Sequence, residues 1–196
     1  MPVPADQIDA DQIDAAVAAL RAGGVIGLPT ETVYGLGADA SNDGAVRRIF
    51  EVKGRPAGHP LIVHMASAEL VDQWAEGSDP RRDALAAAFW PGPLTIIVPS
   101  SGLAAPSVTG GRTTVGLRVP DHPVARAVLE QFGGGVAAPS ANRFGHVSPT
   151  TAAHVRADLG DAVEVILDGG PSRVGVESTI IELVGPTPVL LRPGGI

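Results

Sequence analysis

The sequence predicts a single α/β domain in which a twisted, mixed β-sheet is flanked by helices. Its 196 residues fit one domain that can bury a sizeable core. Hydrophobic residues make up 44% of the chain, which excludes wholesale disorder. Short apolar runs alternate with segments of helical periodicity. Because some expected strands are adjacent in sequence while others are separated by helices, the sheet is expected to be mixed.

The first half of the chain contains clear helix signals. Ile13, Val17 and Leu20 recur at helical spacing, and Asn42 is suited to cap the N-terminus of the next helix. The elements expected here are helix 11–22, strand 25–28, a turn at 29–37 that enters an extended piece, helix 43–52, strand 61–65, helices 67–75 and 81–89, and strand 94–98.

The second half alternates in the same way, and a run of three glycines at 133–135 breaks it. Either Thr150 or Thr151 is expected to cap the last helix. The expected elements are strand 114–119, helix 123–132, strand 136–138, a helix ending at 159, and strands 163–167, 179–184 and 189–191. No linker or internal repeat is evident, so residues 1–196 are expected to form one domain without a second C-terminal domain.

Composition excludes several classes of function. The chain has 14 Lys and Arg against 21 Asp and Glu, a net charge of −7, which disfavours a general nucleic-acid-binding module. It has no cysteine, and hence no disulfide or thiolate site. The N-terminus lacks the basic start and apolar core of a signal peptide, and no run approaches the roughly 20 apolar residues of a membrane span. We therefore expect a cytoplasmic protein.

Common catalytic motifs are absent or weak. No G-x-x-x-x-G-K-[ST] occurs, so a standard P-loop is not expected. Residues 35–40 satisfy the dinucleotide pattern G-x-G-x-x-A, but Pro29 interrupts the lead-in strand, and glycines that permit a tight turn are the better interpretation. Ser140 lies in A-P-S-A-N rather than G-x-S-x-G, which argues against a nucleophile elbow.

Lys53 and Arg55 are the first indication of a phosphate site. Lys53 is the only lysine in the chain and stands two residues before Arg55, after a hydroxyl-rich turn. A compact ammonium beside a planar guanidinium is suited to holding a polyphosphate. The alternative is a solvated basic helix end, where cations favour the helix dipole. The hydroxyl-rich turn favours the phosphate interpretation.

A series of motifs then gives the chain a family resemblance. From about Val25 to Gly194, the sequence resembles the YrdC family of threonylcarbamoyl-AMP synthases in the order and approximate spacing of these motifs. They are P-T-E-T-V-Y-G-L-G (29–37), K-G-R-P (53–56), W-P-G-P-L-T (90–95), G-L-R-V-P (116–120), A-P-S-A-N (138–142), S-P-T (148–150), V-E-S-T-I (176–180) and L-R-P-G (191–194).

The resemblance implies a YrdC-like sheet around a deep nucleotide pocket and a nucleotidyltransferase reaction. L-Threonine, bicarbonate and ATP would give threonylcarbamoyl-AMP and pyrophosphate, and the product would pass to partner proteins that modify tRNA. Mg²⁺ would be carried with ATP rather than caged by the protein. Little direct binding of nucleic acid and no membrane association are expected.

The resemblance also implies roles for individual residues. The residues matching threonine contacts are Thr32, His64, Arg118, Ala138 and Ser178. Those matching ATP contacts are Lys53, Arg55, His59, Ser140, Asn142, Ser148 and Arg192, with Lys53 and Arg55 as the catalytic candidates. His59 departs from the pattern, since relatives usually carry asparagine there, and its charge would vary near neutral pH.

Other interpretations remain open for some of these residues. Without the resemblance, His64 would be taken as a core histidine at the end of an apolar strand. His122 and His154 are expected at helix ends, and no histidine spacing matches a zinc site. Glu31 and Glu177 have the alternative role of holding an arginine in place. Two other function classes also remain, an RNA-binding module and the carbamoyl-transfer domain of YrdC-like hydrogenase maturation proteins.

Overall fold

The computed structural model describes residues 9–196. Residues 1–8, on which the argument about a signal peptide partly rests, lie outside the described part. The strands within it are β1 (Ile26–Leu28), β2 (Gly35–Asp39), β3 (Ile62–His64), β4 (Leu94–Pro99), β5 (Thr114–Arg118), β6 (Val136–Ala137), β7 (Val165–Ile166), β8 (Thr179–Glu182) and β9 (Val189–Arg192).

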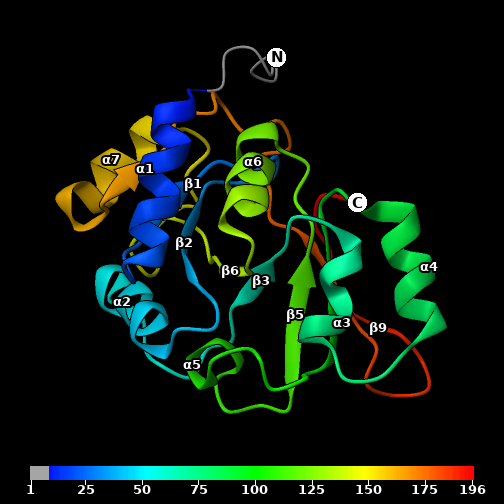
Figure 1. Ribbon diagram of the computed structural model, residues 1–196. Helices are drawn as coiled ribbons and strands as arrows, with labels where there is room; N and C mark the ends of the chain where they lie inside the picture. Colours follow the sequence, from blue (N-terminus) through cyan, green and yellow to red (C-terminus); the bar gives the residue numbers. More distant parts are fainter. Residues whose placement is uncertain (1–8) are drawn as a thin grey trace.

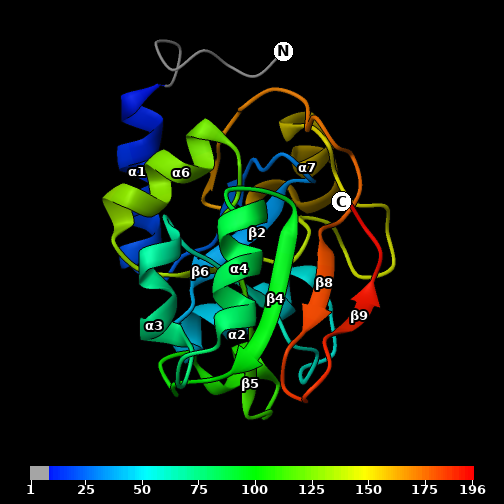
Figure 2. The ribbon, with the colours of Figure 1, turned by 90° about the vertical axis from the view of Figure 1, so that its right-hand side faces the viewer.

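The helices surround these strands, as Figures 1 and 2 show. They are α1 (Ala10–Arg21), α2 (Asp43–Lys53), α3 (Val71–Trp74), α4 (Pro80–Phe89), α5 (Pro106–Thr109), α6 (Pro123–Phe132) and α7 (Ala152–Leu159), with 3-10 turns at Ala68–Leu70 and Gly160–Ala162. Among residues 9–196, none of these helices combines the length and apolar character needed to cross a bilayer.

In the described part of the chain, the strands form one nine-stranded sheet in the order β7-β1-β2-β6-β3-β5-β4-β8-β9. The pairs β1–β7, β3–β5 and β4–β8 are parallel, and the other pairs are antiparallel. The expected mixed sheet with flanking helices is therefore confirmed. In Figure 2 the hairpin of β8 and β9 lies at one edge of the sheet, next to β4.

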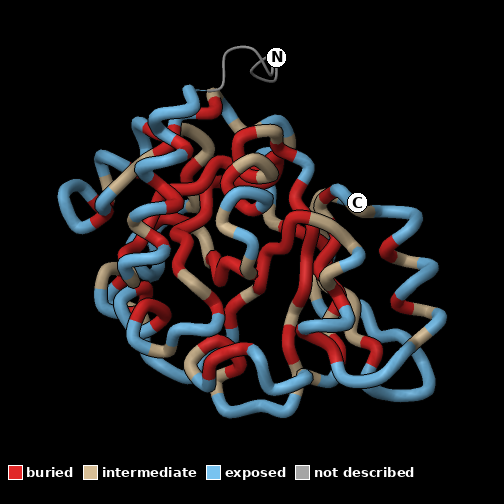
Figure 3. Tube along the Cα trace, viewed as in Figure 1, coloured by how far each residue is buried: buried red, intermediate tan, exposed pale blue. Residues whose placement is uncertain are grey.

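Two apolar clusters hold the helices on the sheet. The smaller one joins α1 and α6, which pack together, to β1 and β6 through side chains such as Leu20, Leu28 and Leu129. The larger one joins α2, α3, α5 and α7 to the central strands through side chains such as Ile49 and Leu117. Figure 3 shows the result, a buried centre of strands with exposed outer helix faces and loops.

Local signals in the sequence explain the helix ends. The side chain of Asn42 accepts a hydrogen bond from the backbone N–H of Ala45, so the expected N-cap of α2 is confirmed. Gly54 follows α2 in the left-handed conformation, with φ of 60°, which ends the helix directly after Lys53. Thr151, rather than Thr150, caps α7 by accepting the N–H of His154.

Three expectations need correction. The helix expected at 67–75 is a 3-10 turn followed by the four-residue α3. Helix α5 was not expected. The glycines of the G-x-G pattern do not form a tight turn, because Gly35 and Gly37 lie in strand β2. A Cβ on Gly37 would come within 2.9 Å of Val136 Cγ1, so this position needs glycine for close packing beside β6.

Candidate functional site

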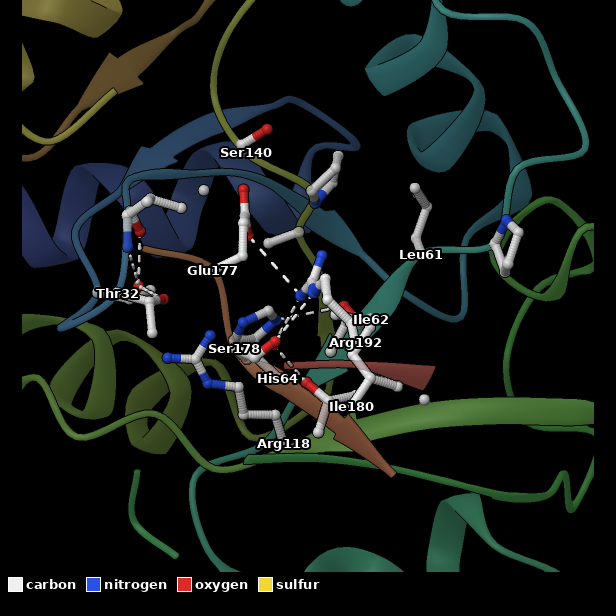
Figure 4. Close-up of a pocket in the computed structure, with 18 of the residues that line it drawn as sticks. Thr32, Leu61, Ile62, His64, Arg118, Ser140, Glu177, Ser178, Ile180 and Arg192 are labelled. Atoms are coloured by element: carbon white, nitrogen blue, oxygen red, sulfur yellow. Dashed lines mark hydrogen bonds and ion pairs between the residues drawn. The ribbon is translucent and has the colours of Figure 1, made fainter. Parts of the chain in front are cut away.

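The strand ends and loops of the sheet enclose a pocket of about 210 Å³ (Figure 4). Residues that the family resemblance matched to threonine and to ATP lie together in its wall. All five residues matched to threonine line it, and so do three of those matched to ATP: Thr32, His64, Arg118, Ala138 and Ser178, with Arg55, Ser140 and Arg192. The structure therefore brings together residues that are up to 160 positions apart in the chain (192 − 32).

Strand pairing places His64 beside Arg118. The two residues end the parallel strands β3 and β5, and they are direct partners in the register of that pair. Paired residues of neighbouring strands project from the same face of a sheet, and both side chains line the pocket. Each residue is 3% exposed. The sheet thus fixes an imidazole and a guanidinium side by side with little freedom.

A buried ion pair orients Arg118. Its Nη2 donates to Glu31 Oε1 at 2.5 Å, and its Nε donates to the carbonyl oxygen of Gly92 at 3.2 Å. The other oxygen of Glu31 accepts the N–H of Asp121 at 3.0 Å. The alternative role for Glu31, holding an arginine in place, is therefore confirmed. Among the described residues Nη1 of Arg118 has no hydrogen-bond partner, so it remains available to a ligand.

His64 is neutral at physiological pH. Burial, followed by the charge of Arg118, lowers the pKa of His64 from 6.5 to about 3. Its Nδ1 lies 3.2 Å from the carbonyl oxygen of Ile62. The ring is thus an uncharged polar group in the pocket wall.

Hydroxyl groups connect the pocket to the C-terminal hairpin. Ser178 Oγ lies 2.8 Å from Thr95 Oγ1. Arg192 donates from Nε to the carbonyl oxygen of Ser178 at 2.9 Å and from Nη2 to Ser178 Oγ at 3.0 Å. Thr95 was not singled out from the sequence, although it closes the W-P-G-P-L-T motif. Ser178 and Arg192, assigned to different substrates, are therefore in direct contact.

Lys53 lies beside the pocket but not in its wall. Its side chain is almost fully buried, so the alternative of a lysine in water at a helix end is wrong. The ammonium donates to the carbonyl oxygens of Ser140 and Asn142, at 2.5 and 2.6 Å. Burial and then the charge of Arg55 lower the pKa of Lys53 from 10.5 to about 8. The expected contact with phosphate stays a prediction.

A hydrogen bond joins the wall of a second hollow, of about 550 Å³, to the wall of the first. Two residues matched to ATP, Asn142 and Ser148, line the second hollow. Ser148 Oγ donates to Glu177 Oε1, in the wall of the first pocket, at 2.8 Å. The ring of His59 lies 6.1 Å from that of Phe144 and lines neither hollow.

Two further histidines, His122 and His154, lie near helix ends as expected. His122 stands at the N-cap position of α6, and His154 lies in the first turn of α7. Within residues 9–196, no three His, Cys, Asp or Glu side chains cluster as a metal site would require.

Comparison with known proteins gives consistent matches. The family model Sua5_yciO_yrdC, described as "Telomere recombination", matches residues 18–194. The threonylcarbamoyl-AMP synthase of Pyrococcus abyssi is 48% identical over 191 residues, which are 97% of this chain and 56% of that protein. The enzyme of the same name from Chromohalobacter salexigens is 41% identical over 177 residues, 90% of this chain and 95% of that protein.

A solved structure extends the match to three dimensions. The crystal structure of P. abyssi Sua5 complexed with L-threonine has a TM-score of 0.95 to this chain at 48% identity, and the match covers 97% of this chain and 56% of that one. The chain spans about half the length of several curated relatives that it matches.

Proposed function

The chain belongs to the Sua5/YciO/YrdC family, and from this premise we propose that it forms threonylcarbamoyl-AMP and pyrophosphate from L-threonine, bicarbonate and ATP. The observation that carries the proposal is the pocket itself. It combines the buried, oriented guanidinium of Arg118 with the cations Arg55 and Arg192. The names of the relatives support the same reaction.

The buried end of the pocket is suited to the amino acid. Arg118 is held by Glu31 and Gly92, which leaves Nη1 and one N–H of Nη2 for a carboxylate. That end-on pair can still bind a carboxylate in bidentate fashion. Thr32 and Ser178 line the same pocket, and their hydroxyl groups could form hydrogen bonds with the polar side chain of a bound threonine. Glu31 already balances the charge of Arg118. A zwitterionic amino acid has no net charge, so its binding keeps this region electrically neutral.

The cationic end is suited to the nucleotide. The pocket volume of about 210 Å³ suits an amino acid, but it is below the roughly 300–1,000 Å³ of typical small-molecule pockets. The pocket is therefore too small to hold the whole of ATP together with threonine. The triphosphate would therefore extend from Arg55 and Arg192 towards the second hollow, where Asn142 and Ser148 lie. Mg²⁺ would arrive with the triphosphate and keep several of its waters.

The proposed reaction has two bond-forming steps. The threonine ammonium first loses its proton to solvent. The neutral nitrogen then attacks the carbon of bicarbonate, which gives a carbamate and water. A carbamate oxygen then attacks the α-phosphorus, and the bond to the β-phosphate oxygen breaks to release pyrophosphate. Neither step needs a covalent enzyme intermediate. The chain would contribute by positioning the reactants and by stabilising charge on the phosphates.

The biological setting is part of the same proposal. We propose a cytoplasmic enzyme whose product passes to separate tRNA-modifying proteins. The product, threonylcarbamoyl-AMP, is a mixed anhydride of a carbamate and a phosphate. It has to leave the pocket without being hydrolysed, because the tRNA-modifying proteins would use it intact.

Pyrophosphate release tests the function. With Mg²⁺ and ATP present, release should require both threonine and bicarbonate, and each is omitted in turn. Mass spectrometry should detect threonylcarbamoyl-AMP only in the complete mixture. Equal release without threonine would rule out the proposed reaction, and no release in any mixture would leave the RNA-binding alternative.

A further inference from the structure

Glu177 occupies an unusual position in the pocket. Within residues 9–196, it is the only acidic side chain that lines this pocket, and Figure 4 shows it with Arg192 in the same wall. Arg55 also lines this pocket. Glu177 Oε2 lies 3.9 Å from Arg192 Nη2. Its charge also raises the pKa values of Arg55 and Arg192 against the lowering effect of their burial. An anionic side chain thus stands where the proposed function needs phosphate to bind.

Glu177 is not needed to orient its cationic neighbour. Both Nε and Nη2 of Arg192 already donate to Ser178, at 2.9 and 3.0 Å. The 3.9 Å separation from Glu177 is too long for a hydrogen bond. The ion pair is also more than a third exposed at both side chains, so solvent weakens it. The alternative role of holding an arginine therefore does not explain this carboxylate.

Ser148 is the residue that Glu177 does engage. Ser148 Oγ donates to Glu177 Oε1 at 2.8 Å, and this is the only hydrogen bond of that hydroxyl within the described residues. The two residues line different hollows, so their bond lies at the boundary between the two spaces. A triphosphate that extends from one hollow to the other has to pass this boundary.

The main chain of Glu177 is fixed while its side chain is weakly held. Its carbonyl oxygen accepts the N–H of Gly195 at 3.1 Å, and a Cβ on Gly194 would come within 2.4 Å of the same oxygen. The carboxylate, by contrast, has a single hydrogen bond to the described part of the chain, and its side chain is 38% exposed. The side chain can therefore move without any rearrangement of the backbone.

We propose that the carboxylate of Glu177 occupies the phosphate subsite of the free protein and is displaced from Ser148 and Arg192 when a polyphosphate binds. The inference rests on the proposed function, because it takes this subsite to be the one that receives the triphosphate. Displacement frees the hydroxyl of Ser148 to donate to a phosphate oxygen. It also removes the repulsion between two anions in one cationic site.

Binding of inorganic pyrophosphate, measured by calorimetry at pH 7.5, tests the inference. Glu177→Gln removes the competing charge and should bind pyrophosphate about tenfold more tightly than the wild type. Glu177→Asp keeps the charge but shortens the side chain, so it cannot reach Ser148. Its affinity should lie between those of the wild type and Glu177→Gln. Glu182→Gln, on β8 and outside the pocket, makes the same change in net charge and should stay within about twofold of the wild type.

The outcomes separate this inference from the function. If Glu177→Gln binds pyrophosphate as the wild type does, or more weakly, then Glu177 does not compete for the subsite and the inference fails while the function stands. If Glu177→Gln binds more tightly but Glu177→Asp behaves like the wild type, the effect is long-range charge and the inference also fails. If neither the wild type nor Glu177→Gln binds pyrophosphate or ATP, both the inference and the proposed function fail.

Discussion

The ammonium nitrogen of Lys53 lies 2.6 Å from the carbonyl oxygen of Asn142. It also bonds to the carbonyl oxygen of Ser140, and the carbonyl oxygen of Lys53 itself accepts the N–H of Phe144 at 2.8 Å. The last residue of α2 is therefore bonded to three positions of the loop that carries Ser140 into the pocket. Lys53 can therefore act on the site by holding this loop in position, in addition to the phosphate contact that the sequence suggested.

Replacing Lys53 should lower turnover. In Lys53→Ala the carbonyl groups of Ser140 and Asn142 lose their buried donor, and the loop can shift. Because small displacements of positioning groups are costly, we expect turnover to fall roughly 10- to 100-fold, and to fall by a larger factor than the Michaelis constant for ATP rises. Lys53→Arg should rescue only partly, since the larger planar head cannot occupy the same point. Steady-state kinetics on folded variants measure this, and near-normal turnover in both would contradict it.

The ionisation of Lys53 can be observed directly because it is the only lysine in the chain. Its side-chain NMR signal should titrate with a midpoint near the pKa of about 8 rather than 10.5. The folded state binds this proton more weakly than the unfolded chain does. Lys53 therefore opposes folding at low pH, and the free energy of unfolding should rise as the pH increases from about 8 to 10.5. A midpoint near 10.5 would show that the side chain is solvated.

Removing the charge of Glu31 should destabilise the fold. The Glu31 and Arg118 side chains are 2% and 4% exposed, so Glu31→Gln leaves a buried guanidinium without its counter-ion. Loss of one partner from such a pair costs about 3–5 kcal/mol. Denaturant unfolding measures the change, and Glu130→Gln, in an exposed pair on α6, is the control. A loss no larger than that of the control would mean that the buried pair is dispensable.

Arg118 should act on threonine more than on ATP. Arg118 lines the pocket that contains all five residues matched to threonine, and it does not line the hollow that contains Ser148. Arg118→Ala should therefore weaken threonine binding by at least about tenfold and leave ATP binding largely intact. Calorimetry with each ligand separately tests this on protein checked for folding. The reverse pattern would assign Arg118 to the nucleotide.

Direct binding to tRNA should be weak. The net charge of −7 leaves few cations to face the phosphate backbone, and the pocket arginines are partly or fully enclosed. We expect binding that falls steeply with added salt and is negligible at physiological ionic strength. Filter binding across a salt series measures it. Submicromolar affinity at physiological salt would favour the RNA-binding alternative.

Local signals in the sequence determined much of the fold. Asn42 before an apolar helical period predicted the start of α2, and the pattern from Pro123 to Phe132 predicted α6 to the residue. These elements depend on caps and periodicity within a few residues. The motifs likewise pointed to eight residues of the pocket wall, because the resemblance matches motifs in order along the chain and needs no knowledge of distances in space.

Tertiary structure decided what those residues face. Nothing near Gly37 in the sequence shows that Val136 occupies the space of a Cβ, so the local pattern alone favours a turn where the structure has a strand. Lys53 was expected in contact with a ligand, yet its ammonium meets carbonyl groups some ninety residues away. Ser148 donates a hydrogen bond to Glu177, 29 residues further along the chain, and no sequence motif indicates this pairing. Hydrogen-bond partners and packing depend on distances in space, which the sequence specifies only once the whole sheet has formed.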